Sequence, residues 1–259
     1  MKAIVLSHDH NRPLVEHMLL TYAQLWPDHP FTFRIAYQKN RNFPDKFGPV
    51  EAIRAPLPIK PCVLKLIEDL PDEEWVYWCI DDKFLIELNA EVGAHLVQYV
   101  SEIDNPSVTG LLFCRCRRMC GPPFVTREPV MVSEKGIHLL KRFDFNQIWL
   151  HQLLRVKVLR DLFNVFPDYD YKAIEMDEFT RQGDDAQELP EDQVLYVTQQ
   201  NFSVLGESMR DGMLTRTCVN SLNKYSLNIP RDFEILDVEV KMGGCNHLAT
   251  KDSICLEFQ

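Results

Sequence analysis

The stretch EWVYWCIDDKFLIE, residues 74–87, decides how this chain is expected to fold. Residues 74–80 form an apolar, aromatic-rich run of the length of a buried strand, and the run ends at two adjacent carboxylates, Asp81 and Asp82. Adjacent like charges repel each other, and a buried carboxylate is costly unless a cation meets it. The pair therefore indicates either a solvated turn, with Lys83 as a local partner, or a site for a metal or a substrate.

The residues before this stretch alternate between strand and helix patterns. Apolar spacing predicts elements in the order β-α-β-β-α-β at residues 2–8, 11–26, 31–37, 50–55, 61–70 and 74–80. This alternation is typical of an α/β fold with a mostly parallel central sheet and helices on both faces. Ligands of such sheets bind beyond the carboxyl ends of the strands. We therefore expect residues 7–11 and the Asp81-Asp82 pair to face one crevice.

The second half of the chain is less regular. Its patterns predict helices at residues 90–103, 145–163 and 215–227, and strands at residues 108–119 and 193–206. No internal repeat or long linker divides the sequence, so a single domain over residues 1–259 is expected.

Composition and charge exclude several classes of function. Hydrophobic residues make up 46% of the chain, which suits a folded globular protein, and the formal net charge is −10. An acidic chain is a poor candidate for a nucleic-acid coat or for binding an anionic membrane. The N-terminus lacks the pattern of a signal peptide, and no apolar run approaches the ~20 residues of a membrane span. The 8 Cys are then expected to be reduced thiols of a cytoplasmic protein.

Three segments resemble GT-A-type glycosyltransferases, the nucleotide-diphospho-sugar transferases, including those that build bacterial surface polysaccharides. IVLSHDHNRP (residues 4–13) resembles the opening strand and loop of that family, and residues 74–87 resemble its strand ending in an Asp-x-Asp or acidic-pair motif. SVLGESMRDGMLTRTCVNSLNKYSLNIP (residues 203–230) resembles a later segment of the polysaccharide enzymes. The resemblance implies a Rossmann-like GT-A fold, with a nucleotide-binding half (1–110), an acceptor half (111–230) and a C-terminal extension (231–259).

The resemblance also implies an activity, the transfer of a sugar from a nucleotide-diphosphate donor to an acceptor hydroxyl. Asp81 and Asp82 would hold Mn²⁺ or Mg²⁺, while Ser7, His8 and Arg12 would line the nucleotide pocket. The acidic motif departs from the family pattern, because either its first acid is lost or Lys83 replaces its last. In the second register Lys83 would supply the positive charge that the metal otherwise brings to the diphosphate.

An inverting transferase needs a carboxylate base for the acceptor hydroxyl. The acidic residues 171–185 offer Glu175 and Glu178, with Asp177 between them, and Glu207 is a further candidate. The expected partners are a nucleotide-sugar donor and a saccharide or glycolipid acceptor of polysaccharide or glycan biosynthesis. Peripheral contact with a membrane is compatible with the sequence, and nucleic acid is not expected as a partner.

Two other functions stay open at this point. His8 and His10 form an H-x-H pair that could belong to a metal-dependent hydrolase, or simply to an exposed loop that leads into a helix. A non-catalytic nucleotide-sugar-binding relative would keep the pocket and lose the chemistry.

The segment CRCRRMC (residues 114–120) lacks the C-x₂-C pairs of zinc ribbons, and only Cys245 and His247 could complete a ligand set from afar. Its three arginines, Arg115, Arg117 and Arg118, suit a diphosphate, an acidic acceptor or a solvated strand edge.

Overall fold

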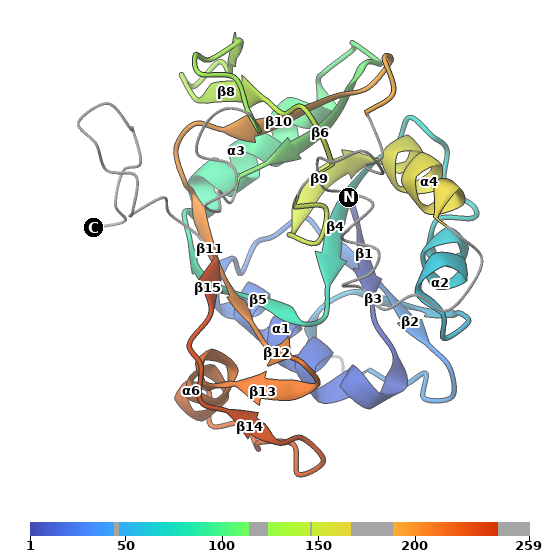
Figure 1. The fold of residues 1–259 in the computed structure, drawn as a ribbon, viewed down its shortest axis with the longest axis vertical. Helices are drawn as coiled ribbons and strands as arrows, with labels where there is room; N and C mark the ends of the chain where they lie inside the picture. Colours follow the sequence, from blue (N-terminus) through green and yellow to red (C-terminus); the bar gives the residue numbers. More distant parts are fainter. Residues whose placement is uncertain (44–46, 114–123, 146, 167–188, 243–259) are drawn as a thin grey trace.

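A nine-stranded mixed sheet in the order β3-β2-β1-β4-β9-β6-β10-β8-β7 forms the framework of the protein (Figure 1). The computed structural model describes residues 1–43, 47–113, 124–145, 147–166 and 189–242. The strands of this sheet are β1 (Lys2–Leu6), β2 (Thr32–Tyr37), β3 (Val50–Arg54), β4 (Trp75–Ile80), β6 (Val108–Leu112), β7 (Met131–Val132), β8 (His138–Lys141), β9 (Gln152–Arg155) and β10 (Val194–Thr198). Strands β3, β2, β1 and β4 are parallel to one another, whereas β9 runs antiparallel to both β4 and β6.

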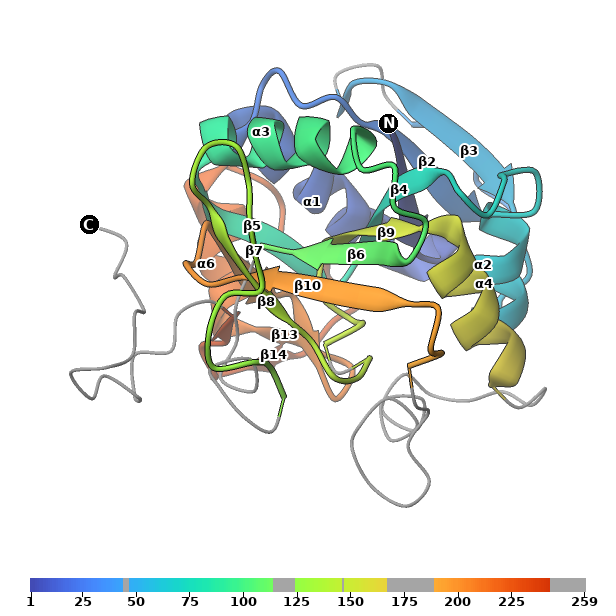
Figure 2. The same ribbon diagram turned by 90° about the horizontal axis from the view of Figure 1, so that it is seen from above.

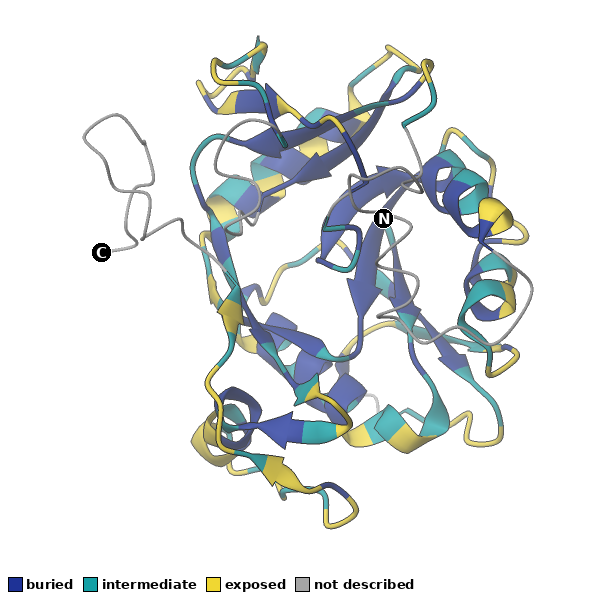
Figure 3. Cartoon of the chain, in the orientation of Figure 1, coloured by how far each residue is buried: buried dark blue, intermediate teal, exposed yellow. Residues whose placement is uncertain are grey.

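Helices cover both faces of this sheet, as the apolar spacing predicts (Figure 2). The helices are α1 (Arg12–Leu25), α2 (Ile59–Leu66), α3 (Ala90–Ser101) and α4 (Val156–Val165), and the 3₁₀ helix η1 (Asp9–Asn11) leads into α1. Met18 of α1 and Leu96 of α3 belong to one core cluster, and Val63 of α2 and Leu159 of α4 belong to another. Because the central strands contribute to both clusters, they are buried on both faces (Figure 3).

A smaller layer extends from the end of β4. Its strands are β5 (Lys83–Leu88), β11 (Ser203–Glu207) and β15 (Lys241–Met242) in one sheet, and β12 (Met209–Arg210), β13 (Met213–Thr215) and β14 (Ile235–Leu236) in another. Helix α6 (Arg216–Lys224) begins at Thr215, whose side chain accepts a hydrogen bond from the Cys218 amide at 3.1 Å. Phe84 and Leu214 form a third core cluster beneath α6. Among the described helices, none combines the length and apolar character needed to cross a membrane.

The α/β class and the first six predicted elements are confirmed. The prediction of one helix over residues 145–163 is wrong, because Gln152–Arg155 form strand β9 and α4 begins only at Val156. All four residues of β9 are buried, and a run that is buried on both faces carries no period that separates a strand from a helix. The strand predicted at 193–206 is two strands, β10 and β11, which lie in different sheets. The part of the strand predicted at 114–119 lies outside the described residues.

Gly206 allows β11 to lie against the Phe84 ring of β5. A Cβ atom at this position would lie 2.4 Å from Phe84 Cζ, closer than any real contact. We therefore expect Gly206→Ala to lower the free energy of unfolding by about 1–3 kcal/mol, the range for overpacked sites, in a urea titration. Adding Phe84→Leu to that variant should recover part of the loss, and a Gly206→Ala variant as stable as the wild type would contradict the packing described here.

Candidate functional site at the ends of β1 and β4

The ends of β1 and β4 bring the predicted loop and the acidic pair together. The two strands are parallel neighbours with Leu6 opposite Ile80, and the Asp81 amide donates a hydrogen bond to the Leu6 carbonyl at 3.2 Å. Residues 7–12 and 81–82 therefore leave the sheet at the same edge. This is the edge at which α/β sheets bind their ligands.

Asp81 is a buried carboxylate that lacks a full set of partners. Only 6% of the residue is exposed, and burial, with the neighbouring charge of Asp82, raises its pKa to about 7. Hydrogen bonding of the carboxylate with the Ser7 and Asn11 side chains, together with the charge of Lys83, partly offsets this rise in pKa. Even so, Asp81 Oδ2 meets no hydrogen-bond geometry with any described residue. A buried carboxylate oxygen without a donor indicates that a cation or ligand belongs beside it.

Lys83 is the centre of a group of ion pairs beside Asp81. Its Nζ lies 2.8 Å from Asp82 Oδ1 and 3.3 Å from Glu207 Oε1, and Arg210 contacts the other oxygen of Glu207 at 2.8 Å. Burial alone would lower the pKa of Lys83, but the charges of Asp82 and Glu207 outweigh it and raise that pKa. Lys83 therefore stays protonated in the interior.

The antiparallel pairing of β5 with β11 places Glu207 opposite Lys83. The acidic residue considered as a further candidate for the base thus lies in the same group as the acidic pair.

The carbonyl of Ile80, which precedes Asp81, accepts a hydrogen bond from His151, the residue directly before the neighbouring strand β9. His151 Nε2 lies 3.1 Å from the Ile80 oxygen, and its Nδ1 lies 2.7 Å from the Tyr22 hydroxyl. Burial lowers the pKa of His151 to about 4, so the ring is neutral at pH 7. Since a carbonyl can only accept, Nε2 carries the proton and Nδ1 accepts from Tyr22. Sequence reasoning missed His151, because a single histidine in an apolar run gives no distinct signal.

Hydrogen bonds join the loop before α1 to residues 38–40, which follow β2. The Asp9 carboxylate accepts backbone hydrogen bonds from residues 38–40 at 2.6–3.2 Å, and these outweigh burial and lower its pKa. The Arg12 guanidinium also bonds to the Asn40 carbonyl and lies 3.6 Å from the centre of the Phe43 ring. Arg12 and Phe43 together present a planar cation stacked on an aromatic ring.

The rings of the two histidines in this loop stack on each other, and one of them also packs on Phe233, which is far away in the sequence. The His8 and His10 rings are stacked with centroids 6.1 Å apart, and His10 packs on Phe233 at 4.8 Å. Burial and the neighbouring His10 lower the pKa of His8. Within the described part of the chain, no group of three or more His, Cys, Asp or Glu side chains could hold a metal. The arrangement does not favour the hydrolase that the H-x-H pattern suggested.

Several predicted residues lie outside the described ranges. These are the candidate bases Glu175 and Glu178, Asp177 between them, the cysteines and arginines of residues 114–120, and Cys245 and His247. Of the nucleotide-pocket candidates, Ser7 is buried, while His8 in the loop and Arg12 at the start of α1 are partly exposed.

Comparison with known proteins gives resemblances of fold at low identity. No family model matches the sequence, and no curated protein matches it. The galactosyltransferase LgtC, in complex with donor and acceptor sugar analogues, is similar with a TM-score of 0.37 and 14% identity; 62% of this chain is covered, and the chain spans 60% of LgtC. An active-site mutant of LgtC gives a TM-score of 0.43 and 11% identity over 90% of this chain and 98% of that one.

A nucleotidyltransferase is similar as well. The 2-C-methyl-D-erythritol 4-phosphate cytidylyltransferase of Francisella tularensis gives a TM-score of 0.36 and 11% identity over 63% of this chain and 76% of that one. The similar structures thus include a galactosyltransferase and a cytidylyltransferase.

Proposed function

We propose that this protein is a GT-A-type glycosyltransferase that moves a sugar from a nucleoside-diphosphate donor to an acceptor hydroxyl. The observation that carries the proposal is the Asp81 carboxylate, buried at the carboxyl end of β4 with Oδ2 unpartnered among the described residues. Its place beside the loop after β1 is where an α/β sheet would meet a nucleotide. The residue types fit this chemistry, because a leaving diphosphate gathers negative charge that a cation stabilises.

The acidic pair suits Mn²⁺ or Mg²⁺ as the cation. Such ions prefer oxygen ligands and are commonly held by one or two carboxylates, with substrate phosphates and water completing the shell. Asp81 and Asp82 would hold the ion, which when bound supplies positive charge to the departing diphosphate. Three carboxylates (Asp81, Asp82 and Glu207) face two cations (Lys83 and Arg210) here, so an ionised Asp81 leaves one negative charge unbalanced.

Lys83 supports the metal rather than replacing it in this proposal. Its ammonium is already engaged by Asp82 and Glu207 and is almost fully buried. A lysine in this position fixes the Asp82 carboxylate and limits the repulsion between the two acids. It has little freedom to turn toward a diphosphate.

The remaining proposed roles are those that the family resemblance implies. Ser7, His8 and Arg12 would line the nucleotide pocket, with the Arg12–Phe43 stack as a flat surface at its rim. The proposed base that deprotonates the acceptor is Glu175 or Glu178, since Glu207 is bound by Lys83 and Arg210. The proposed acceptor is a saccharide or glycolipid of polysaccharide or glycan biosynthesis.

The proposal is tested by the release of nucleoside diphosphate from a panel of UDP-, GDP-, CDP- and dTDP-sugars with Mn²⁺ and simple saccharide acceptors. We expect release from one class of donor, and a fall of about a hundredfold or more in Asp82→Asn, because charge stabilisation at the leaving group is lost. Glu91→Gln, at an exposed ion pair with Lys135, serves as the matched control. Full activity in Asp82→Asn would contradict the assignment, and donor binding without any turnover would indicate the non-catalytic relative.

A further inference from the structure

A pocket lies between α6 and β5, farther along β5 from the acidic pair. Its volume is about 180 Å³. Its lining includes Phe84 and Ile86 of β5, Thr217, Ser221 and Lys224 of α6, and Lys241. Since one water occupies about 30 Å³ of liquid, this space suits a ligand of roughly six to ten non-hydrogen atoms.

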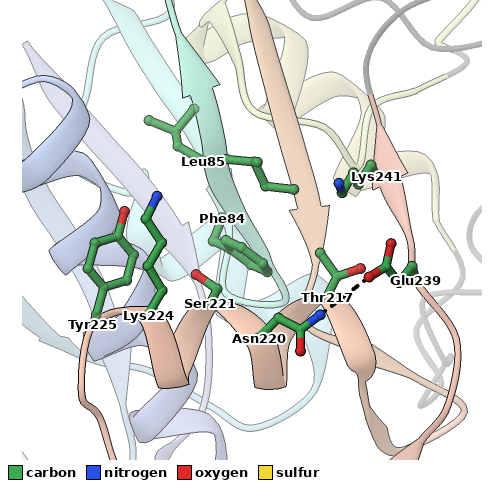
Figure 4. Close-up of a pocket in the computed structure, with 10 residues that line it drawn as sticks. Phe84, Leu85, Thr217, Asn220, Ser221, Lys224, Tyr225, Glu239 and Lys241 are labelled. Atoms are coloured by element: carbon green, nitrogen blue, oxygen red, sulfur yellow. Dashed lines mark hydrogen bonds between the residues drawn. The ribbon is translucent and has the colours of Figure 1, made fainter.

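The pocket has an apolar floor and a cationic rim. Phe84 is buried at its base, whereas Lys224 and Lys241 are exposed on opposite sides of it (Figure 4). Over the described ranges, neither lysine has an ion pair with a carboxylate, and Lys224 lies 5.3 Å from the centre of the Tyr225 ring. Two lysines without a counter-ion beside an apolar floor favour a ligand that is both apolar and anionic.

Glu239 is the acidic residue among those that line the pocket, and a hydrogen bond partly offsets its negative charge. Glu239 lies across the pocket from Tyr225, and its Oε1 accepts a hydrogen bond from Asn220 Nδ2 at 3.3 Å (Figure 4). Two lysines and one glutamate leave a net charge of +1 at the rim. This local excess contrasts with the net charge of −10 on the whole chain.

A buried histidine orients a hydroxyl on the wall of this pocket. His17 is fully buried, its Nε2 lies 2.8 Å from Ser221 Oγ, and its Nδ1 has no partner among the described residues. Burial lowers the pKa of His17 to about 4, so the ring is neutral at pH 7. A buried N–H without an acceptor is rarer than an acceptor without a donor. Because Nδ1 has no partner among the described residues, Nδ1 is the bare acceptor and Nε2 carries the proton. Nε2 then donates to Ser221, and the serine O–H is free to donate into the pocket.

We infer that the pocket between α6 and β5 binds a small organic anion, an apolar or aromatic body that carries one carboxylate or phosphate group. The body lies on Phe84 and Ile86, the anionic group is met by Lys224 and Lys241, and the Ser221 hydroxyl donates to it. This site is separate from the proposed donor site and does not depend on the sugar-transfer chemistry.

The charge preference is tested with ligands of nearly equal size. The probes are benzoate, phenylphosphonate, neutral benzamide and cationic benzamidine. Each is titrated into the full chain without nucleotide while the methyl NMR signals of Ile86 and Thr217 are followed. We expect saturable shifts with the two anions and binding weaker by about tenfold or more with the neutral and cationic probes, since these probes lack the charged hydrogen bonds to the lysines. Comparison of the two anions distinguishes a carboxylate ligand from a phosphate ligand.

Variants at the rim complete the test. Lys224→Met and Lys241→Met change exposed side chains, and each should weaken benzoate or phenylphosphonate binding by about tenfold, with about threefold for Ser221→Ala. Lys135→Met, at an exposed lysine remote from the pocket, should leave binding unchanged. The inference is overturned if benzamidine binds as well as benzoate, if neither lysine variant weakens the anions, or if no probe shifts these methyl signals at about 20 mM.

Discussion

Asp81→Asn is expected to stabilise the fold at pH 8 while abolishing metal-dependent binding of a nucleoside diphosphate. The pKa of Asp81 is raised from an ordinary 3.8 to about 7, so the folded state binds this proton more tightly than the unfolded state does. The free energy of unfolding therefore falls through Asp81 as the pH rises from about 4 to about 7. At pH 8 the carboxylate is ionised, and its full destabilising effect is present. One pKa unit corresponds to about 1.4 kcal/mol, so the shift limits the destabilisation by ionised Asp81 to about 4 kcal/mol. We expect Asp81→Asn to raise the free energy of unfolding by about 2 kcal/mol.

The pH dependence separates this effect from a general change in packing. Urea titrations of wild type and Asp81→Asn should differ most at pH 8 and converge as the pH falls toward 4, because both then carry a neutral side chain. Asp82→Asn is the matched control, since Asp82 is partly exposed and paired with Lys83, and it should not stabilise the fold. A loss of stability in Asp81→Asn at pH 8 would show that the carboxylate is satisfied in the fold and does not await a ligand.

Lys83→Met is expected to produce the largest loss of stability. Its ammonium is buried and contacts both Asp82 and Glu207, so its removal leaves two carboxylates without their central cation. Breaking a buried ion pair from one side costs about 3–5 kcal/mol in the free energy of unfolding. Urea unfolding at pH 8 measures this change.

Arg210→Met is the control for this variant. Arg210 also contacts Glu207, but its side chain is 44% exposed, and exposed ion pairs contribute about 0–1 kcal/mol. Adding Glu207→Gln to Lys83→Met should restore part of the stability, because it removes one of the stranded charges. If Lys83→Met unfolds within about 1 kcal/mol of the wild type, the ion-pair group is not the structural centre described here.

The sequence predicted the part of the fold that depends on local pattern. Alternating strands and helices over residues 2–80 specify parallel strands, and parallel strands place residues 7–12 beside Asp81-Asp82 without further information. The pattern failed at β9, where a strand from late in the chain enters antiparallel between β4 and β6. Both of its faces are buried, and periodicity is then uninformative.

The site was predictable in its location but not in its contacts. Asp82 and Lys83 are adjacent in sequence, yet Glu207 reaches Lys83 across 124 positions through the pairing of β5 with β11. His151 reaches the Ile80 carbonyl across 71 positions through the unexpected strand β9. Such partners are set by strand order, and no spacing in the sequence indicates them.

The central claim, a metal-dependent nucleotide site at Asp81 and Asp82, is tested most directly by thermal melting with UDP, GDP and CDP, each with and without Mn²⁺. We expect one nucleotide to raise the melting temperature only when Mn²⁺ is present, since a ligand at a hundredfold excess over Kd stabilises the native state by about 2.7 kcal/mol. The same nucleotide should have no effect on Asp81→Asn. A rise that needs no metal or persists in that variant, or no rise with any nucleotide, would contradict the account.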